Sequence, residues 1–379
     1  MAVSIAINFG HIPFSIMTQS KQELVKNRAA SALRAAFVAD ALAMPVHWYY
    51  RAGDIIRQFP EGLNAFFDAP AKHPSSIMSL HSTSQGGRST AQRSRLPEIV
   101  GDVILKGKRQ YWDVANMHYH QGMKAGENTL NAHCARLLMR TLADTGRRYD
   151  PDAFLDAYID MMTAEPARHP DTYAESYHRG FFANWAAGKP ADQCAAVTHD
   201  TASIGGLVTL APLIIAERLA GVDIETVAEH CKLHLSLTHP GDELATVAVH
   251  YAYLLDTLLH HGDRDPGLVI EEFARKGIGL NLQALLQKNL GDNEVVGGLF
   301  SPACYISGAW PSVLYFARKY VDRPSKALQA NAEAGGDNVH RGFILATLLG
   351  AIQPEWNWLF DRLVDATAID SEIKSLIAF

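Results

Sequence analysis

Apolar residues recur at spacings of three and four along most of this chain, and this periodicity constrains the fold more than any other feature. The clearest stretches cover residues 24–42, 130–142, 154–162, 207–219, 247–259, 313–320 and 343–349. This spacing places the apolar side chains on one face of an α-helix, and no stretch of useful length alternates as a half-buried β-strand does. Glycine or proline stands at many of the boundaries, which is typical of helix ends. The sequence therefore predicts an all-α fold.

The absence of linker-like sequence indicates one large domain. A length of 379 residues would by itself suggest two or three domains, but no Pro/Ser/Gly-rich linker separates the periodic stretches. We predict a single multi-helix domain over residues 17–379, with a loop-rich part at 60–97. Residues 1–16 are apolar but have no basic n-region, unlike a secretory signal. They are predicted to be an appendage with no catalytic role.

Composition argues against several classes of protein. Hydrophobic residues make up 48% of the chain and charged residues 20%, with a net charge of −6, as in soluble globular proteins and without the basic excess of a nucleic-acid-binding surface. No run is predicted to be long and apolar enough to span a membrane. The four cysteines are far apart and show no C-x-x-C spacing, so we expect free thiols in a reducing compartment, the cytoplasm. The sequence leaves the oligomeric state open.

The stretch 332–351 (AEAGGDNVHRGFILATLLGA) places polar residues at the start of an apolar helix. Gly335 and Gly336 allow a tight turn and a close approach of the backbone to a ligand. Asp337 and Asn338 are favourable N-cap residues, so the first amides and the positive dipole end of the helix should face a site. An ion or anionic ligand would suit this arrangement, although a plain capped helix start would use the same residues.

A second stretch, 118–131 (HYHQGMKAGENTLN), has a related layout. A glycine precedes an acid–amide–hydroxyl run that begins at Glu127, and an apolar helix follows. His118 and His120 lie just upstream of this run. Because they are two residues apart, only an extended or turn segment would bring both side chains to one side, and the glycines of this stretch favour such a segment.

Taken together, the two stretches resemble the ADP-ribosylglycohydrolase superfamily, which includes dinitrogenase-reductase-activating glycohydrolases, ADP-ribosylhydrolases and J1-crystallins. Further similarity follows the family's order in residues 39–45 (ADALAMP), 203–212 (SIGGLVTLAP), 237–240 (LTHP) and 304–311 (CYISGAWP). The resemblance implies an all-α domain of the ADP-ribosylglycohydrolase type, with its site between two helices that begin near Asn128 and Asp337. It also implies a hydrolase that cleaves an N-glycosidic-type bond in an ADP-ribosyl or nucleoside-like substrate.

The family holds a pair of divalent metals with two runs, Thr-Asp-Asp-Thr and Asp-x-Asp-Thr. Carried over onto this chain, the runs fall on Gly126, Glu127, Asn128 and Thr129, and on Asp337, Asn338, Val339 and His340. Two carboxylates thus remain where the family pattern has four. Since Mg²⁺ requires several oxygen ligands with enough negative charge, we do not expect a two-Mg²⁺ centre of the usual kind.

Several interpretations of these departures stay open. A re-equipped centre would use Glu127, Asp337 and His340 as ligands for Zn²⁺, Mn²⁺ or Fe²⁺, which accept imidazole. Without a metal, Glu127 and Asp337 would form a carboxylate pair that activates water, with His340 as general acid or base. The scaffold could also serve as a non-catalytic binding or structural protein, as J1-crystallin does, or act on a small metabolite other than ADP-ribose.

The predicted catalytic residues are therefore Glu127, Asp337 and His340. The residues expected to contact the substrate are Asn128, Asn338, His118, His120, Gly205, Gly206 and His239. The two asparagines would orient hydroxyl groups, the amides of the two glycines are candidates for anion contact, and His239 enters through the resemblance. Asp40 lies within an apolar helix and needs a buried partner. His47, where many family members carry an acid, is expected at the surface.

Overall fold

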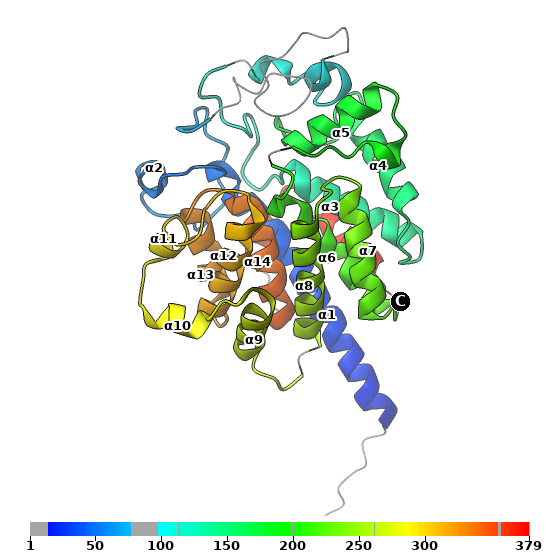
Figure 1. Ribbon diagram of the computed structural model, residues 1–379, viewed down its shortest axis with the longest axis vertical. Coiled ribbons are helices and arrows are strands. Elements are labelled where there is room, and N and C mark those ends of the chain that lie inside the picture. The colour runs from blue at the N-terminus through cyan, green and yellow to red at the C-terminus, as the bar shows by residue number, and fades with distance from the viewer. Residues whose placement is uncertain are drawn as a thin grey trace, which may run out of the picture.

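The computed structural model describes residues 14–76, 98–112, 114–198, 200–260, 262–354 and 358–378, with side chains from residue 21 onward. Its helices are α1 (Phe14–Ala43), α2 (Ala52–Gln58), α3 (Leu130–Asp144), α4 (Pro151–Thr163), α5 (Ser176–Ala186), α6 (Leu210–Leu219), α7 (Ile224–Ser236), α8 (Asp242–Leu259), α9 (Pro266–Ile278), α10 (Leu282–Gln287), α11 (Asp292–Val295), α12 (Ile306–Lys319), α13 (Pro324–Glu333), α14 (Asn338–Ile352) and α15 (Ala366–Ile377). Short helical turns are η1 (Met44–Val46), η3 (Ile99–Val103), η4 (Arg109–Tyr111), η5 (Ala191–Gln193), η6 (Ile204–Leu207) and η7 (Phe360–Arg362). Within the described ranges there is no β-strand, and the prediction of an all-α fold is confirmed (Figure 1).

Helices α1 and α14 form the centre of the bundle and share its most extensive helix–helix interface (Figure 1). Small residues make this close approach possible, because a Cβ atom added to Gly350 would lie only 2.7 Å from the Cα atom of Ala32. Helices α12 and α13 pack on α14, α15 packs on α3 and α1, and α8 packs on α14 and α7. One hydrophobic core runs through all of these elements.

The strongest periodic stretches correspond to helices whose ends the sequence could only approximate. The predicted 130–142 is helix α3, and the predicted 343–349 is the apolar middle of α14, which begins at Asn338. Helices α5, α7, α9, α13 and α15 were not among the predicted stretches. Residues 60–76 are irregular as expected, whereas 77–97 and most of the predicted appendage, residues 1–13, lie outside the described residues.

The apolar first helix corrects one prediction. The stretch Lys21–Val46 is long and apolar enough to cross a membrane by length and composition, contrary to the expectation that no run would be. However, 94% of its most apolar window is buried inside the fold. It therefore packs as a core helix of this fold.

Candidate functional site

Backbone hydrogen bonds around the glycine pair at the start of α14 join three chain segments. The amide of Gly336 donates to the carbonyl of Tyr49 at 2.7 Å, and the amide of Trp48 donates to the carbonyl of Gly336 at 2.8 Å. The amide of Asp337 donates to the carbonyl of Pro302 at 2.8 Å. Gly336 has a φ of +65°, and a Cβ atom there would lie 1.9 Å from the Pro302 oxygen. The close approach that the sequence predicted for a ligand is made by the protein's own backbone.

The carboxylate of Asp337 lies at the centre of a buried cluster. Asp337 stands in the N-cap position of α14, as predicted, but its side chain makes no capping hydrogen bond. Instead its Oδ1 lies 3.1 Å from Nε2 of His47 and 2.8 Å from Nδ1 of His340. All three residues are at most 2% exposed. The structure thus brings Asp337 and His340 together and adds His47, which is deeply buried rather than at the surface as predicted.

A chain of polar contacts continues from His47 to a second carboxylate. Nδ1 of His47 lies 2.7 Å from Nε2 of His120, and Nδ1 of His120 lies 2.8 Å from Oδ1 of Asp171. The Asp171 carboxylate also accepts the amides of Leu130 and Tyr173 at 2.8 and 3.1 Å. Asp171 therefore holds His120, and His120 fixes the orientation of the His47 ring.

His340 is supported from its other side by an amide and a third carboxylate. Nε2 of His340 lies 3.0 Å from Nδ2 of Asn131 and 3.6 Å from Oε1 of Glu175. Asn131 donates to the same Glu175 oxygen at 2.7 Å, and its own Oδ1 accepts from the Tyr177 hydroxyl at 2.8 Å. Asn131 lies in the first turn of α3, which begins at Leu130, and Glu175 immediately precedes α5, so helix starts position both side chains.

Burial and neighbouring charges separate the pKa values of these groups. Burial would raise the pKa of Asp337, but His340 and His47 outweigh this effect and hold it well below its usual range. Burial would lower the pKa of His340, but the charges of Asp337 and Glu175 raise it to about 9. Burial raises the pKa of Glu175 to about 7, with His340 opposing and Asp337 adding to the shift. Burial lowers the pKa of His47 well below its usual value, so its ring is neutral.

A small cavity adjoins this cluster. It has a volume of about 10 Å³, which is room for roughly one water molecule. Its lining residues are His47, Trp48, His120, Thr129, Leu130, Asn131, Asp171, Tyr173, Glu175 and His340. Trp48 stacks on His47 with ring centroids 3.5 Å apart and is only 8% exposed. An aromatic side chain therefore covers the His47 ring.

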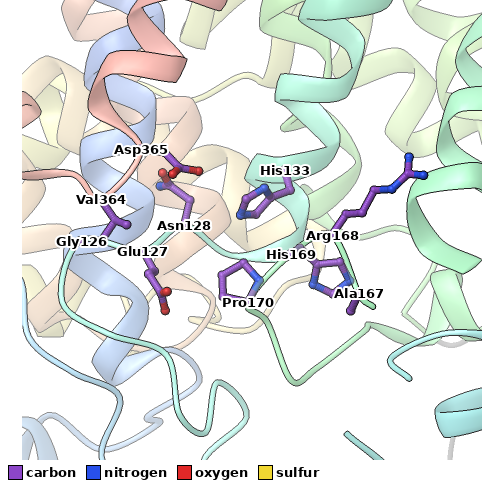
Figure 2. Close-up of a pocket in the computed structure, with 10 residues that line it drawn as sticks. All are labelled: Gly126, Glu127, Asn128, His133, Ala167, Arg168, His169, Pro170, Val364 and Asp365. Carbon is purple, nitrogen blue, oxygen red and sulfur yellow. The ribbon is translucent and has the colours of Figure 1, made fainter. Parts of the chain in front are cut away.

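Glu127 does not join Asp337 and His340 in this cluster. It lines a separate open pocket of about 410 Å³ between the start of α3 and the segment before α15. Figure 2 shows its carboxylate pointing away from Asn128 and Asp365. The Glu127 carboxylate accepts the amide of Lys124 at 2.7 Å, which closes a local turn. The predicted convergence of Glu127 with the two C-terminal residues is therefore not present.

The two predicted substrate-contacting asparagines are engaged with the protein itself. Nδ2 of Asn128 donates to Asp40 Oδ1 and to the carbonyl of Phe37, both at 2.8 Å. Asp40 also accepts the amide and hydroxyl of Thr129 at 2.9 and 2.6 Å, which supplies its expected buried partner. Nδ2 of Asn338 donates to backbone carbonyls, including that of Ala332 at 2.8 Å.

Of the predicted histidines, only His120 and His340 line the cavity. His118 and His120 share an irregular segment, as their spacing required, but Nε2 of His118 lies 3.1 Å from the carbonyl of Pro45. His239 is buried against the Tyr177 ring, with centroids 3.9 Å apart.

The amides of Gly205 and Gly206, which were expected to contact an anion, donate hydrogen bonds within the protein. The Gly205 amide donates to the Ser203 hydroxyl at 3.1 Å, and the Gly206 amide donates to the Ser203 carbonyl at 3.2 Å. Both amides thus serve the turn that precedes α6. They are not directed at a ligand.

Four residues of this site are not among the site residues predicted from the sequence: His47, Asn131, Asp171 and Glu175. Each is polar in a stretch with little periodicity or at a helix start, so no pattern distinguished it from a cap. At His47 the available signal was the family resemblance, which implies an acid at this position.

Comparison with known proteins agrees with this architecture. Residues 21–356 match the sequence profile of the ADP-ribosylglycohydrolase family. The chain belongs to the ADP-ribosylglycohydrolase family. A solved structure titled "ADP-ribosylglycohydrolase-related protein complex" is similar to the family fold seen here, with a TM-score of 0.55 and 16% identity over 94% of this chain and 98% of that chain. No curated protein sequence matches the chain.

The residues present do not fit the carboxylate-rich metal pair that the family implies. Both oxygens of Asp40 are occupied by Asn128 and Thr129. Glu127 lies in another pocket, and the second aspartate of the C-terminal run is replaced by Val339. Asp337 is then the one carboxylate of the two family runs that faces the cluster, and a single carboxylate does not balance two hard divalent cations.

Proposed function

We propose that this member of the family hydrolyses an N-glycosidic-type bond to ribose in an ADP-ribosyl or nucleoside-like substrate. Family membership supports the class of reaction. The observation that carries the proposal is Glu175, a buried carboxyl group that lines the cavity beside His340 and has a pKa of about 7. Such a group can give or take a proton near neutral pH, as hydrolysis requires.

The other groups have complementary roles in this proposal. Asp337 stays ionised and supplies negative charge next to the cavity, which favours an oxocarbenium-like centre. His340 lies between Asp337 and Glu175 and couples the protonation of the two carboxyl groups. Asn131 orients Glu175 through its amide. Glu175 thereby takes the role that the sequence suggested for Glu127, with a site that is either metal-free or holds a non-standard metal.

A second candidate function is favoured by the small volume of the cavity. With room for about one water molecule, the cavity does not admit a nucleotide in this conformation. A binding or structural role, as suggested by the J1-crystallin resemblance, would need no substrate access to His340. In either case we propose a cytoplasmic protein with a small-molecule or ADP-ribosyl partner, and neither a nucleic-acid nor a membrane partner.

The test is an activity screen on the purified full chain. Wild type would be incubated with NAD⁺, ADP-ribosylated arginine and serine peptides, and nucleosides, and released ADP-ribose or ribose separated by chromatography. We expect turnover of at least one substrate, and a loss of about 10²–10⁴-fold in Glu175→Gln. Glu229→Gln, on the exposed side of α7, is the matched control. Binding of ADP-ribose without turnover of any substrate would favour the non-catalytic role instead.

A further inference from the structure

The three groups of the central cluster are placed like ligands around one point. One ring nitrogen of His47, a carboxylate oxygen of Asp337 and one ring nitrogen of His340 all lie within 4.8 Å of one another. Among the described residues, this is the one group of histidine, cysteine or acidic side chains that meets that criterion. The ligands come from the turn after α1 and from the first turn of α14, which the glycine pair holds together.

Two atoms of the cluster lack the hydrogen bonds that burial demands. Asp337 Oδ2 and His340 Nδ1 are buried and have no hydrogen-bond partner among the described residues. Nδ1 of His340 is 2.8 Å from Asp337 Oδ1, but it is not aligned for a hydrogen bond. Unsatisfied buried polar atoms are costly. A cation bound between these atoms would satisfy both of them.

The other nitrogen of each imidazole already has an outer partner. Nδ1 of His47 faces His120, whose far nitrogen is held by Asp171. Nε2 of His340 lies 3.6 Å from an oxygen of the Glu175 carboxylate, which is an acceptor, whereas the Asn131 Nδ2 beside it is a donor. Metal-ligating histidines characteristically engage their second ring nitrogen in this way, since the outer contact fixes the ring and its tautomer.

The neighbouring histidines do not offer this geometry. Nε2 of His118 lies 3.1 Å from the Pro45 carbonyl, and its Nδ1 accepts the amide of His120 at 3.1 Å. Nε2 of His73 lies 2.8 Å from the His47 carbonyl, and its Nδ1 accepts the amide of Ser75 at 3.0 Å. Both rings are occupied by backbone groups, so they serve the turn rather than an ion.

We propose that His47, Asp337 and His340 bind one metal ion that accepts nitrogen ligands, such as Zn²⁺, Fe²⁺ or Mn²⁺. This ion would take the place of the pair of divalent cations that the family implies. Two imidazoles and one carboxylate are a ligand set for such ions, and the adjoining cavity leaves room for a water molecule in a further coordination position. This inference deepens the proposed function, but metal binding and hydrolysis are measured separately.

The test begins with metal-free full chain, prepared by chelation and titrated with CoCl₂ while the visible absorption of the ion is followed. We expect one equivalent of Co²⁺ to bind and ZnCl₂ to displace it. Asp337→Asn, His47→Gln and His340→Gln should each weaken binding by more than about 100-fold. His230→Gln is the matched control, because His230 also pairs with a buried carboxylate, that of Glu217 in α6.

A measurement on wild type tests the ligand set even if the variants fail to fold. X-ray absorption at the zinc edge of the Zn²⁺-loaded wild type should show two imidazole ligands together with oxygen donors. Absence of stoichiometric binding, an all-oxygen ligand shell, or folded variants with unchanged affinity would overturn the inference. A protein that binds one ion but hydrolyses no ribosyl substrate would retain the metal site and remove the proposed function. A protein that hydrolyses a ribosyl substrate but binds no metal ion would do the reverse.

Discussion

The imidazole rings of His47 and His120 lie almost parallel, at an interplanar angle of 4°, with Nδ1 of His47 2.7 Å from Nε2 of His120. A contact this short between two ring nitrogens requires one proton between them. A carboxylate lies at each end of this contact: Oδ1 of Asp171 is 2.8 Å from Nδ1 of His120, and Oδ1 of Asp337 is 3.1 Å from Nε2 of His47. The pair thus connects two carboxylates that are far apart in sequence.

Replacing His120 tests this link without removing a proposed ligand. His120→Asn is expected to lower Co²⁺ affinity by about 10–100-fold, as loss of an outer-shell partner does. The measurement is the same absorption titration, with His230→Asn as control. Unchanged affinity in a folded His120→Asn protein would contradict the orienting role.

Replacing Glu175 and Glu127 separately tests which glutamate belongs to the site. If a ribosyl substrate is found, Glu175→Gln should reduce kcat by about 10²–10⁴-fold, because a positioned proton donor or acceptor is lost. Glu127→Gln should have a much smaller effect, since its carboxylate closes a local turn. If Glu127→Gln reduced kcat more than Glu175→Gln does, the catalytic role that the sequence suggested for Glu127 would be restored.

Trp48 offers a test of backbone strain at the cavity. Its φ is 61°, a left-handed conformation that costs a residue with a side chain about 1–2 kcal/mol. Loss of the buried ring should destabilise either small variant by about 3–5 kcal/mol. Glycine avoids the strain, so Trp48→Gly should unfold at a higher denaturant concentration than Trp48→Ala. Equal midpoints, or a more stable alanine variant, would show that the conformation is not strained.

The glycine pair can be tested against a glycine of the same conformation in open space. Gly336 and Gly279 have φ values of +65° and +67°, but nothing lies within 4 Å of a Cβ atom added to Gly279. Gly279→Ala should therefore cost only the left-handed penalty of about 1–2 kcal/mol. Gly336→Ala should cost on the order of 3–4 kcal/mol, because its Cβ atom would collide with the Pro302 carbonyl. Urea unfolding of both variants measures the difference.

The raised pKa of His340 predicts a pH dependence of stability in metal-free protein. Its folded-state pKa of about 9 lies above the ordinary value of 6.5. A raised pKa of a base contributes stability that is fully present below the unfolded pKa and is lost as pH rises through the folded pKa. The free energy of unfolding should therefore fall between pH 6.5 and 9. His340→Gln should flatten this part of the profile in chelator-treated protein, and a wild-type profile that rises in this window would refute the assignment.

Much of the fold could be predicted because helical periodicity and caps are local properties. The apolar spacing of 130–142 located α3, and the turn chemistry at Asp337 located the start of α14. Polar partners are not local, so the site could be predicted only in part. Nothing near His47 in the sequence indicates that its partner is Asp337, and a carboxylate before a helix, such as Glu175, has the pattern of an ordinary cap.

The central pairing of α1 with α14 also has a consequence for biosynthesis. Helix α1 leaves the ribosome early, but α14 ends only at Ile352. At a synthesis rate of about 5–20 residues per second, roughly 15–60 s pass between the synthesis of α1 and that of α14. During that interval the nascent chain lacks the main native partner of a hydrophobic helix, and we expect chaperones that bind such segments on the ribosome to recognise it.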